Sequence, residues 1–159
     1  MRTNLVTLSL LLLSVLCATC SNAQEPLSAE STTKTDLREV IFRYMFIHYN
    51  YGPSVKVVCI APERPLPDSF ILRFSNVKPR VVWSFNCDNS GPMNGVREKK
   101  TGARGIRMSI INMQLLDGQH AEAEVEAFSD GIAANWNALQ VAFSEGRWSV
   151  TRDKIDGVS

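Results

Sequence analysis

Catalytic and cofactor-binding motifs are missing from this sequence. It has two histidines, and it contains no HExxH motif, no nucleophile elbow, no glycine-rich phosphate loop and no dinucleotide fingerprint. The sequence therefore lacks the commonest signatures of four enzyme classes: metalloproteases, α/β-hydrolases, nucleotide hydrolases and nicotinamide enzymes. The sequence therefore predicts no metal and no cofactor, and a noncatalytic protein is a better interpretation than an enzyme.

A strong excess of one charge is also missing. The chain has 17 Lys and Arg against 16 Asp and Glu, a formal net charge of +1. Such a balance gives no reason to expect nucleic acid or an acidic membrane as a partner. One local cluster is basic, and we interpret it as a solvated loop and strand, with anion or acidic-partner binding as the alternative; its members are Arg97, Lys99, Lys100, Arg104 and Arg107.

The long apolar run lies at the N-terminus. Residues 5–16 are apolar except for Thr and Ser, follow a basic start and are too few for a good membrane span. We predict a signal peptide over residues 1–23 with cleavage after Ala23, and lipidation at Cys20 is the alternative. The mature chain is then secreted or periplasmic and has no stable membrane span.

Cysteine use agrees with export. Of four cysteines, Cys17 and Cys20 leave with the leader, so Cys59 and Cys87 remain as an even pair in an oxidising compartment. A disulfide between them is the predicted state. A reactive thiol or metal site and an unmodified buried pair are the alternatives, although the chain has no CxxC motif and no histidine near either cysteine.

The predicted domain covers residues 36–159, after a polar and flexible leader over residues 24–35. Asp36 is the predicted N-cap of a helix that Gly52 and Pro53 end. The candidate pocket residues are on the apolar, aromatic face of this helix: Tyr44, His48 and Tyr51. An imidazole beside phenols suits a general base or a ligand donor, while a core or rim position is the alternative.

Extended structure is predicted for most of the remaining chain. Residues 55–60 and 80–85 are strand-like, with a short helix capped by Asp68 between them. Four alternating segments joined by glycine-containing turns follow, over residues 105–113, 121–127, 136–143 and 147–151. We predict an α+β fold in which the N-terminal helix packs on a curved, mainly antiparallel sheet that ends in a four-stranded meander.

This order of elements resembles the nuclear transport factor 2-like (cystatin-like α+β) superfamily, and within it a group of exported bacterial proteins. The matching segments are residues 101–105 (TGARG), 121–125 (AEAEV) and 146–153 (GRWSVTRD). The resemblance implies a sheet curled around the helix to form a cone. Members include dehydratases, isomerases and epoxide hydrolases with Asp, His or Tyr inside the cone, and also noncatalytic proteins.

Three functions compete on these grounds. The first is a noncatalytic module that binds a small apolar ligand, or a protein partner through the outer face of the sheet. The second is a structural domain that forms a homodimer by packing sheet against sheet, which the apolar face of Trp136, Ala138 and Ala142 would permit. The third is an enzyme that uses His48 and Tyr44 inside the cone.

Overall fold

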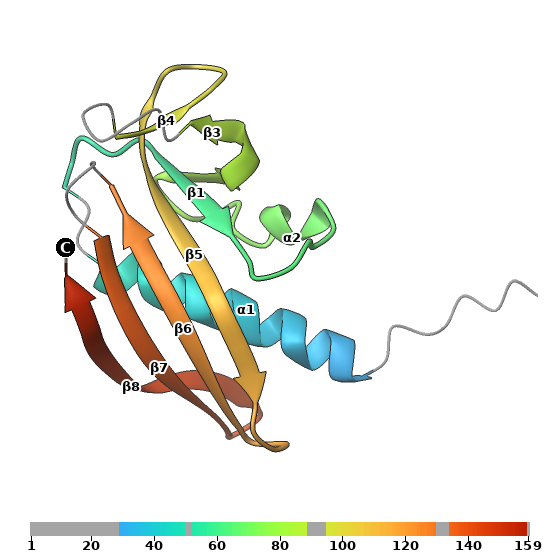
Figure 1. Cartoon of the computed structure of the whole chain (residues 1–159). Helices are drawn as coiled ribbons and strands as arrows, with labels where there is room; N and C mark the ends of the chain where they lie inside the picture. Colours follow the sequence, from blue (N-terminus) through green and yellow to red (C-terminus); the bar gives the residue numbers. More distant parts are fainter. Residues whose placement is uncertain (1–28, 50–51, 89–94, 130–133, 159) are drawn as a thin grey trace, which may run out of the picture.

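The fold is a large sheet with a long helix across one face (Figure 1). The computed structural model describes residues 29–49, 52–88, 95–129 and 134–158. The predicted signal peptide and Tyr51 lie outside these ranges. In chain order the elements are α1 (Ala29–His48), β1 (Val57–Ala61), α2 (Ser69–Leu72), β2 (Arg80–Trp83), the 3-10 turn η1 (Ser84–Asn86), β3 (Cys87–Asp88), β4 (Val96–Glu98), β5 (Arg104–Leu115), β6 (His120–Phe128), β7 (Ala134–Ser144) and β8 (Arg147–Val158).

The sheet is mixed and eight-stranded, so the predicted fold class is wrong. Its main order is β2-β1-β5-β6-β7-β8, and β3 pairs with β4, which pairs with β5. The strand β1 runs parallel to both of its neighbours, β2 and β5. The protein is therefore not a helix packed on a four-stranded meander. The meander is one half of a larger sheet, and β1 joins it to a parallel half.

The composition of β1 explains the parallel half. Parallel strands are usually covered on both faces and therefore read as continuous apolar runs. In β1, Val58 and Ile60 belong to the core under α1, whereas Val57 and Cys59 pack on the opposite face with Val82. A strand that needs cover on both faces belongs inside a sheet, and β1 lies between β2 and β5.

Gly105 lets β5 approach β1 and β4 closely. A Cβ atom placed on this residue would lie 2.8 Å from Cγ1 of Val57 and 3.1 Å from its carbonyl oxygen. Real Cβ atoms do not approach other atoms at the first of these distances, so a larger residue would push the strands apart. The segment 101–105 therefore has two roles. It turns the chain, and its last glycine allows the close contact between β5 of the meander and β1 of the parallel half.

The four predicted meander segments are strands β5 to β8, paired antiparallel in sequence order. A bulge interrupts the pairing of β5 with β6 between Ile110 and Asn112. Since a bulge adds one residue to a strand, the alternation shifts after it. Ile110 and Met113 consequently both contact the core, while Ile111 is 52% exposed on the outer face.

The helix α1 begins at Ala29, not at Asp36, so the predicted N-cap is wrong. Residues 29–35, assigned from the sequence to a polar leader, belong to this helix. Asp36 lies inside the helix, where its carboxylate accepts a hydrogen bond from Arg73 at 2.7 Å. Aspartate is common at N-caps, but here it forms an ion pair with a residue that is distant in the sequence. Capping rules consider only neighbours along the chain, so they do not predict this contact.

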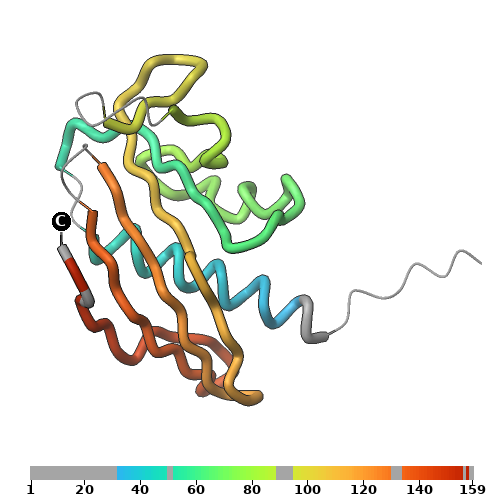
Figure 2. Tube along the Cα trace, viewed as in Figure 1, coloured from blue at the N-terminus to red at the C-terminus, as the bar shows by residue number. Residues whose placement is uncertain are grey.

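The core lies between α1 and the inner face of the sheet, which bends around the helix so that β8 curves along its side (Figure 2). Aromatic side chains from α1 and the α2 segment fill the region beside the parallel half: Phe42, Phe46, Phe70 and Phe74. Small residues of β6, such as Ala121 and Ala123, face the helix from the meander.

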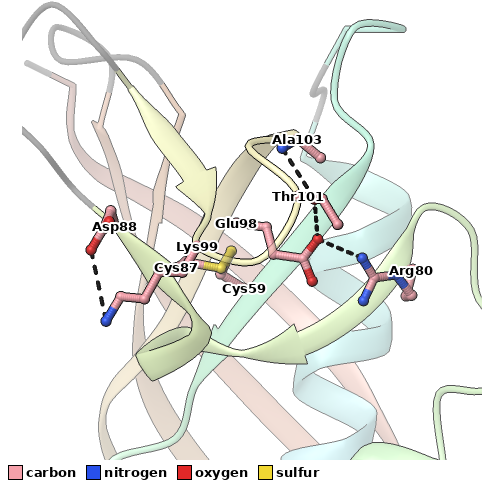
Figure 3. The surroundings of a disulfide bond; sticks show 8 residues. All are labelled: Cys59, Arg80, Cys87, Asp88, Glu98, Lys99, Thr101 and Ala103. Atoms are coloured by element: carbon pink, nitrogen blue, oxygen red, sulfur yellow. Dashed lines mark hydrogen bonds and ion pairs between the residues drawn. A yellow bond between two sulfur atoms is a disulfide. The ribbon is translucent and has the colours of Figure 1, made fainter.

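The predicted disulfide is present and joins β1 to β3 through Cys59 and Cys87 (Figure 3). Beside it, the buried carboxylate of Glu98 accepts hydrogen bonds from Arg80, at 2.6 Å, and from the hydroxyl of Thr101. The Arg80 guanidinium and then the Thr101 hydroxyl lower the pKa of Glu98. The disulfide and this ion pair together connect the β3–β4 pair to the parallel strands.

Candidate functional site

Two of the three predicted pocket residues contact each other at the end of α1. The rings of Tyr44 and His48 stack with their centroids 4.1 Å apart. Tyr44 is half-buried and His48 is exposed. The third residue, Tyr51, lies outside the described residues. The predicted pocket is therefore represented by an aromatic pair at the rim of the core.

The carboxylate of Asp153 lies next to this pair. The Tyr44 hydroxyl donates a hydrogen bond to Oδ2 of Asp153 at 3.1 Å. The side-chain amide of Asn137 donates to Oδ1 of the same carboxylate. The phenol of Tyr49, directly after α1, is close enough for the charge of Asp153 to act on it. These side chains meet at one point, which we name the Asp153 cluster, consisting of Tyr44, Tyr49, Asn137 and Asp153.

A bulge in β8 turns Asp153 toward the inner face. Trp148 and Val150 contact the core, so simple alternation would place Arg152 next on that face. The pairing instead passes from Val141–Val150 to Gln140–Arg152, which leaves Thr151 as an extra residue. Arg152 therefore lies on the outer face and Asp153 on the inner face. Sequence reasoning missed Asp153 because an alternation pattern does not show this bulge.

Two buried polar atoms of the cluster have no hydrogen-bond partner among the described residues. They are the hydroxyl of Tyr49 and Oδ1 of Asn137. Both residues are less than one-tenth exposed. Buried polar groups are normally paired, and each unpaired group costs roughly 1–3 kcal/mol. A further polar group beside the carboxylate, such as a water molecule, would supply the partners that these two atoms lack.

Both phenols of the cluster remain protonated at neutral pH. Burial, the hydrogen bond to Asp153 and the charge of Asp153 raise the pKa of Tyr44. Burial and then the charge of Asp153 raise the pKa of Tyr49 above its ordinary value of 10.0. The two hydroxyls are therefore hydrogen-bond donors, and neither serves as a base near pH 7.

The raised pKa of Tyr49 predicts a specific alkaline response. Below about pH 10 the phenol is neutral in both the folded and the unfolded chain. As the pH rises toward the folded-state pKa, only the unfolded chain ionises, so the folded state loses stability. We expect Tyr49→Phe to lose less stability than the wild type between pH 8 and pH 11 in urea unfolding. At pH 8 the variant should be at least as stable, because it removes an unpaired hydroxyl. An equal alkaline loss in both proteins would contradict the assignment.

The exposed side chain beyond the cluster is apolar. Ile155 pairs with Asn137 across β7 and β8, so it lies on the same face as Asp153, and it is 67% exposed. Ile155 and the stacked pair of His48 and Tyr44 thus give the carboxylate an apolar and aromatic rim. The arrangement combines one fixed negative charge with surfaces that suit a ring or an alkyl group.

The described residues show neither a metal site nor a helix suited to crossing a membrane. Within the described ranges, no three His, Cys, Asp or Glu side chains are grouped so that they could hold a metal ion. None of the helices in that part of the chain combines the length and hydropathy that a membrane crossing requires.

Comparison with known proteins gives no match: no family model fits the chain, and neither a curated protein nor a solved structure is significantly similar to it. The resemblance to the nuclear transport factor 2-like superfamily therefore stays a prediction.

Proposed function

We propose that this protein is a noncatalytic binding module for a small ligand that carries a protonated amine on an apolar body. The observation that carries the proposal is the Asp153 carboxylate, which is half-buried and accepts hydrogen bonds from two neutral donors, Tyr44 and Asn137. The sequence predicts a small apolar ligand, and the charge of Asp153 adds a cationic group to that ligand.

The electrostatics of the cluster favour a cation. Neither Tyr44 nor Asn137 neutralises the negative charge of Asp153, and a half-buried charge attracts an opposite charge more strongly than one in bulk water. Aromatic faces also attract ammonium groups. A ligand nitrogen at Asp153 would leave its apolar part against His48 and Ile155 at the rim.

Binding fits the site better than catalysis. The two phenols are held in their neutral form, so neither is a base. The ring of His48 stacks flat on Tyr44, and no hydrogen bond within the described residues joins it to Asp153. An enzyme that uses His48 and Tyr44 would need an oriented imidazole, which this stacked arrangement does not supply.

Titration with 2-phenylethylamine at pH 7 tests the proposal, with 3-phenylpropanoate as the anionic counterpart of similar size. We expect NMR shifts at residues around Asp153 for the amine, and weaker or no binding of the anion. Asp153→Asn should weaken amine binding by about 10-fold to 100-fold, because it removes a charged hydrogen-bond acceptor. Glu124→Gln is the matched control, since it removes one carboxylate from the other face of the sheet.

Two outcomes would overturn this function. One is the absence of amine binding in the wild type at millimolar concentration. The other is amine binding that Asp153→Asn leaves unchanged while the variant stays folded by circular dichroism. If His48→Ala abolished a turnover without changing the fold, the enzyme alternative would replace the proposal.

We further propose that the protein works outside the cytosol, as a secreted or periplasmic chain beginning at Gln24. The disulfide is compatible with an oxidising compartment. The apolar run over residues 5–16 supports export. The N-terminal residue of the mature chain distinguishes cleavage after Ala23 from lipidation at Cys20. Membership of the nuclear transport factor 2-like superfamily is likewise proposed on the resemblance alone.

A further inference from the structure

The outer face of the meander separates its charges by strand. Glu122 of β6 pairs with Gln140 of β7, which pairs with Arg152 of β8. In the next row, Glu124 pairs with Ala138, which pairs with Lys154. Directly paired residues lie on the same face of a sheet. Each row therefore has an acid on β6, an uncharged residue on β7 and a base on β8.

This face is also hollowed and partly apolar. A depression of about 430 Å³ lies over the two charged rows, lined by side chains of both signs. A second hollow of about 340 Å³ adjoins it, lined by Ile111, Glu126 and Trp136 among others. On this otherwise polar face, Ile111 is 52% exposed and Trp136 is 39% exposed. Aromatic residues such as Trp136 are enriched in protein–protein interfaces relative to the rest of the surface.

We propose that this outer face binds a second copy of the same chain. The two-fold axis would run between the stacked sheets along β7. Such an axis places β7 against β7 of the partner and exchanges the positions of β6 and β8, because these two strands lie at equal distances on either side of β7. The acidic strand of each protomer then faces the basic strand of the other.

Charge complementarity favours a second copy of the chain as the molecule that binds this face. The face is close to neutral as a whole, yet its two signs lie on separate strands, so it attracts neither a uniformly acidic nor a uniformly basic partner. A copy of itself supplies the reverse order of charges. Ala138 and Gln140 at the centre leave room for two sheets to pack face to face, about 10 Å apart, with Trp136 of each protomer in the interface.

The inferred dimer leaves the Asp153 cluster accessible, because that cluster is on the inner face of the sheet, beside α1. Self-association and amine binding are therefore separate properties of the molecule. A failed dimer test leaves the binding proposal standing, and a failed ligand titration leaves the dimer proposal standing.

Two double variants test the dimer. Glu122→Arg with Glu124→Arg makes both flanking strands basic, and Arg152→Glu with Lys154→Glu makes both acidic. We expect sedimentation or native mass spectrometry to show a wild-type dimer whose self-association weakens by about 100-fold or more in either variant, because like charges then face each other. Mixing the two variants should restore a dimer that contains one chain of each.

The variant with all four substitutions is the matched control. It has the same net charge as the wild type and exchanges the acidic and basic strands, so it should dimerise like the wild type. Trp136→Glu should abolish the dimer in every background. A wild type that stays monomeric at 100-micromolar levels would overturn the inference, as would double variants that still self-associate or a mixture that does not form the heterodimer.

Discussion

Replacing Glu63 with alanine is expected to lower the free energy of unfolding by about 3–5 kcal/mol, because the change leaves a buried charge without its partner. Arg38 on α1 is 1% exposed. Its guanidinium donates from Nε to Oε2 of Glu63 at 3.2 Å and from Nη2 to Oε1 of the same side chain. The remaining bond, from Nη1 to the carbonyl of Lys34 at 2.7 Å, does not neutralise the cation. Urea unfolding at pH 7 measures the effect.

A double variant provides the control for this prediction. Arg38→Met with Glu63→Leu removes both charges and fills the site with apolar side chains of similar volume. Replacing a buried ion pair in this way is often neutral or stabilising. The double variant should therefore be clearly more stable than Glu63→Ala. A cost of less than about 1 kcal/mol for Glu63→Ala alone would contradict the prediction, because that is the range of surface ion pairs. It would mean that the Arg38 guanidinium can reach water once Glu63 is removed.

Removing the disulfide by Cys59→Ala with Cys87→Ala is expected to cost about 3.5 kcal/mol of stability. The bond joins residues 28 positions apart, and closing a loop of this size reduces the entropy of the unfolded chain by about that amount on the chain-entropy model. Thermal and urea unfolding of the purified double variant, without reductant, would show a lower melting temperature and a lower urea midpoint.

Adding reductant to the wild type gives a second measurement of the same quantity. Reduced wild type and the double variant should unfold at similar urea concentrations, because both lack the covalent link. Oxidised wild type that matches the double variant would contradict the prediction and would mean that the β3–β4 pair is stabilised by Glu98 and its partners instead.

Local patterns in the sequence were sufficient to find β1, β2, the four meander strands and the disulfide, whereas the short strands β3 and β4 were not predicted. The turn residues and the apolar alternation of β5 to β8 are short-range signals, and the pairing in the structure follows them. The partner strands of β1 were not predictable, since a continuous apolar run shows burial on both faces but not which strands lie beside it. For this reason the α+β class with a mainly antiparallel sheet is incorrect.

The candidate site was predictable only in part. Tyr44 and His48 were found because they repeat at helical spacing on α1. Asp153 and Asn137 were missed, since their meeting depends on a bulge at Thr151 and on the curvature of β8 around the helix. Arg38 was missed for a related reason: its carboxylate partner comes from a loop 25 positions away, and no periodicity links the two.

The mixed topology also sets an expected order of folding. In the meander each strand pairs with the next, so its contacts close short loops at small entropic cost. In contrast, Val57 of β1 pairs with Gly105, about 50 positions later, and that contact must wait until the intervening chain is ordered. We therefore expect the three hairpins of β5 to β8 to form the nucleus, with β1 and β2 joining it late. Substitutions at the β1–β5 contact should then mainly speed unfolding, while those within β6 and β7 should slow folding.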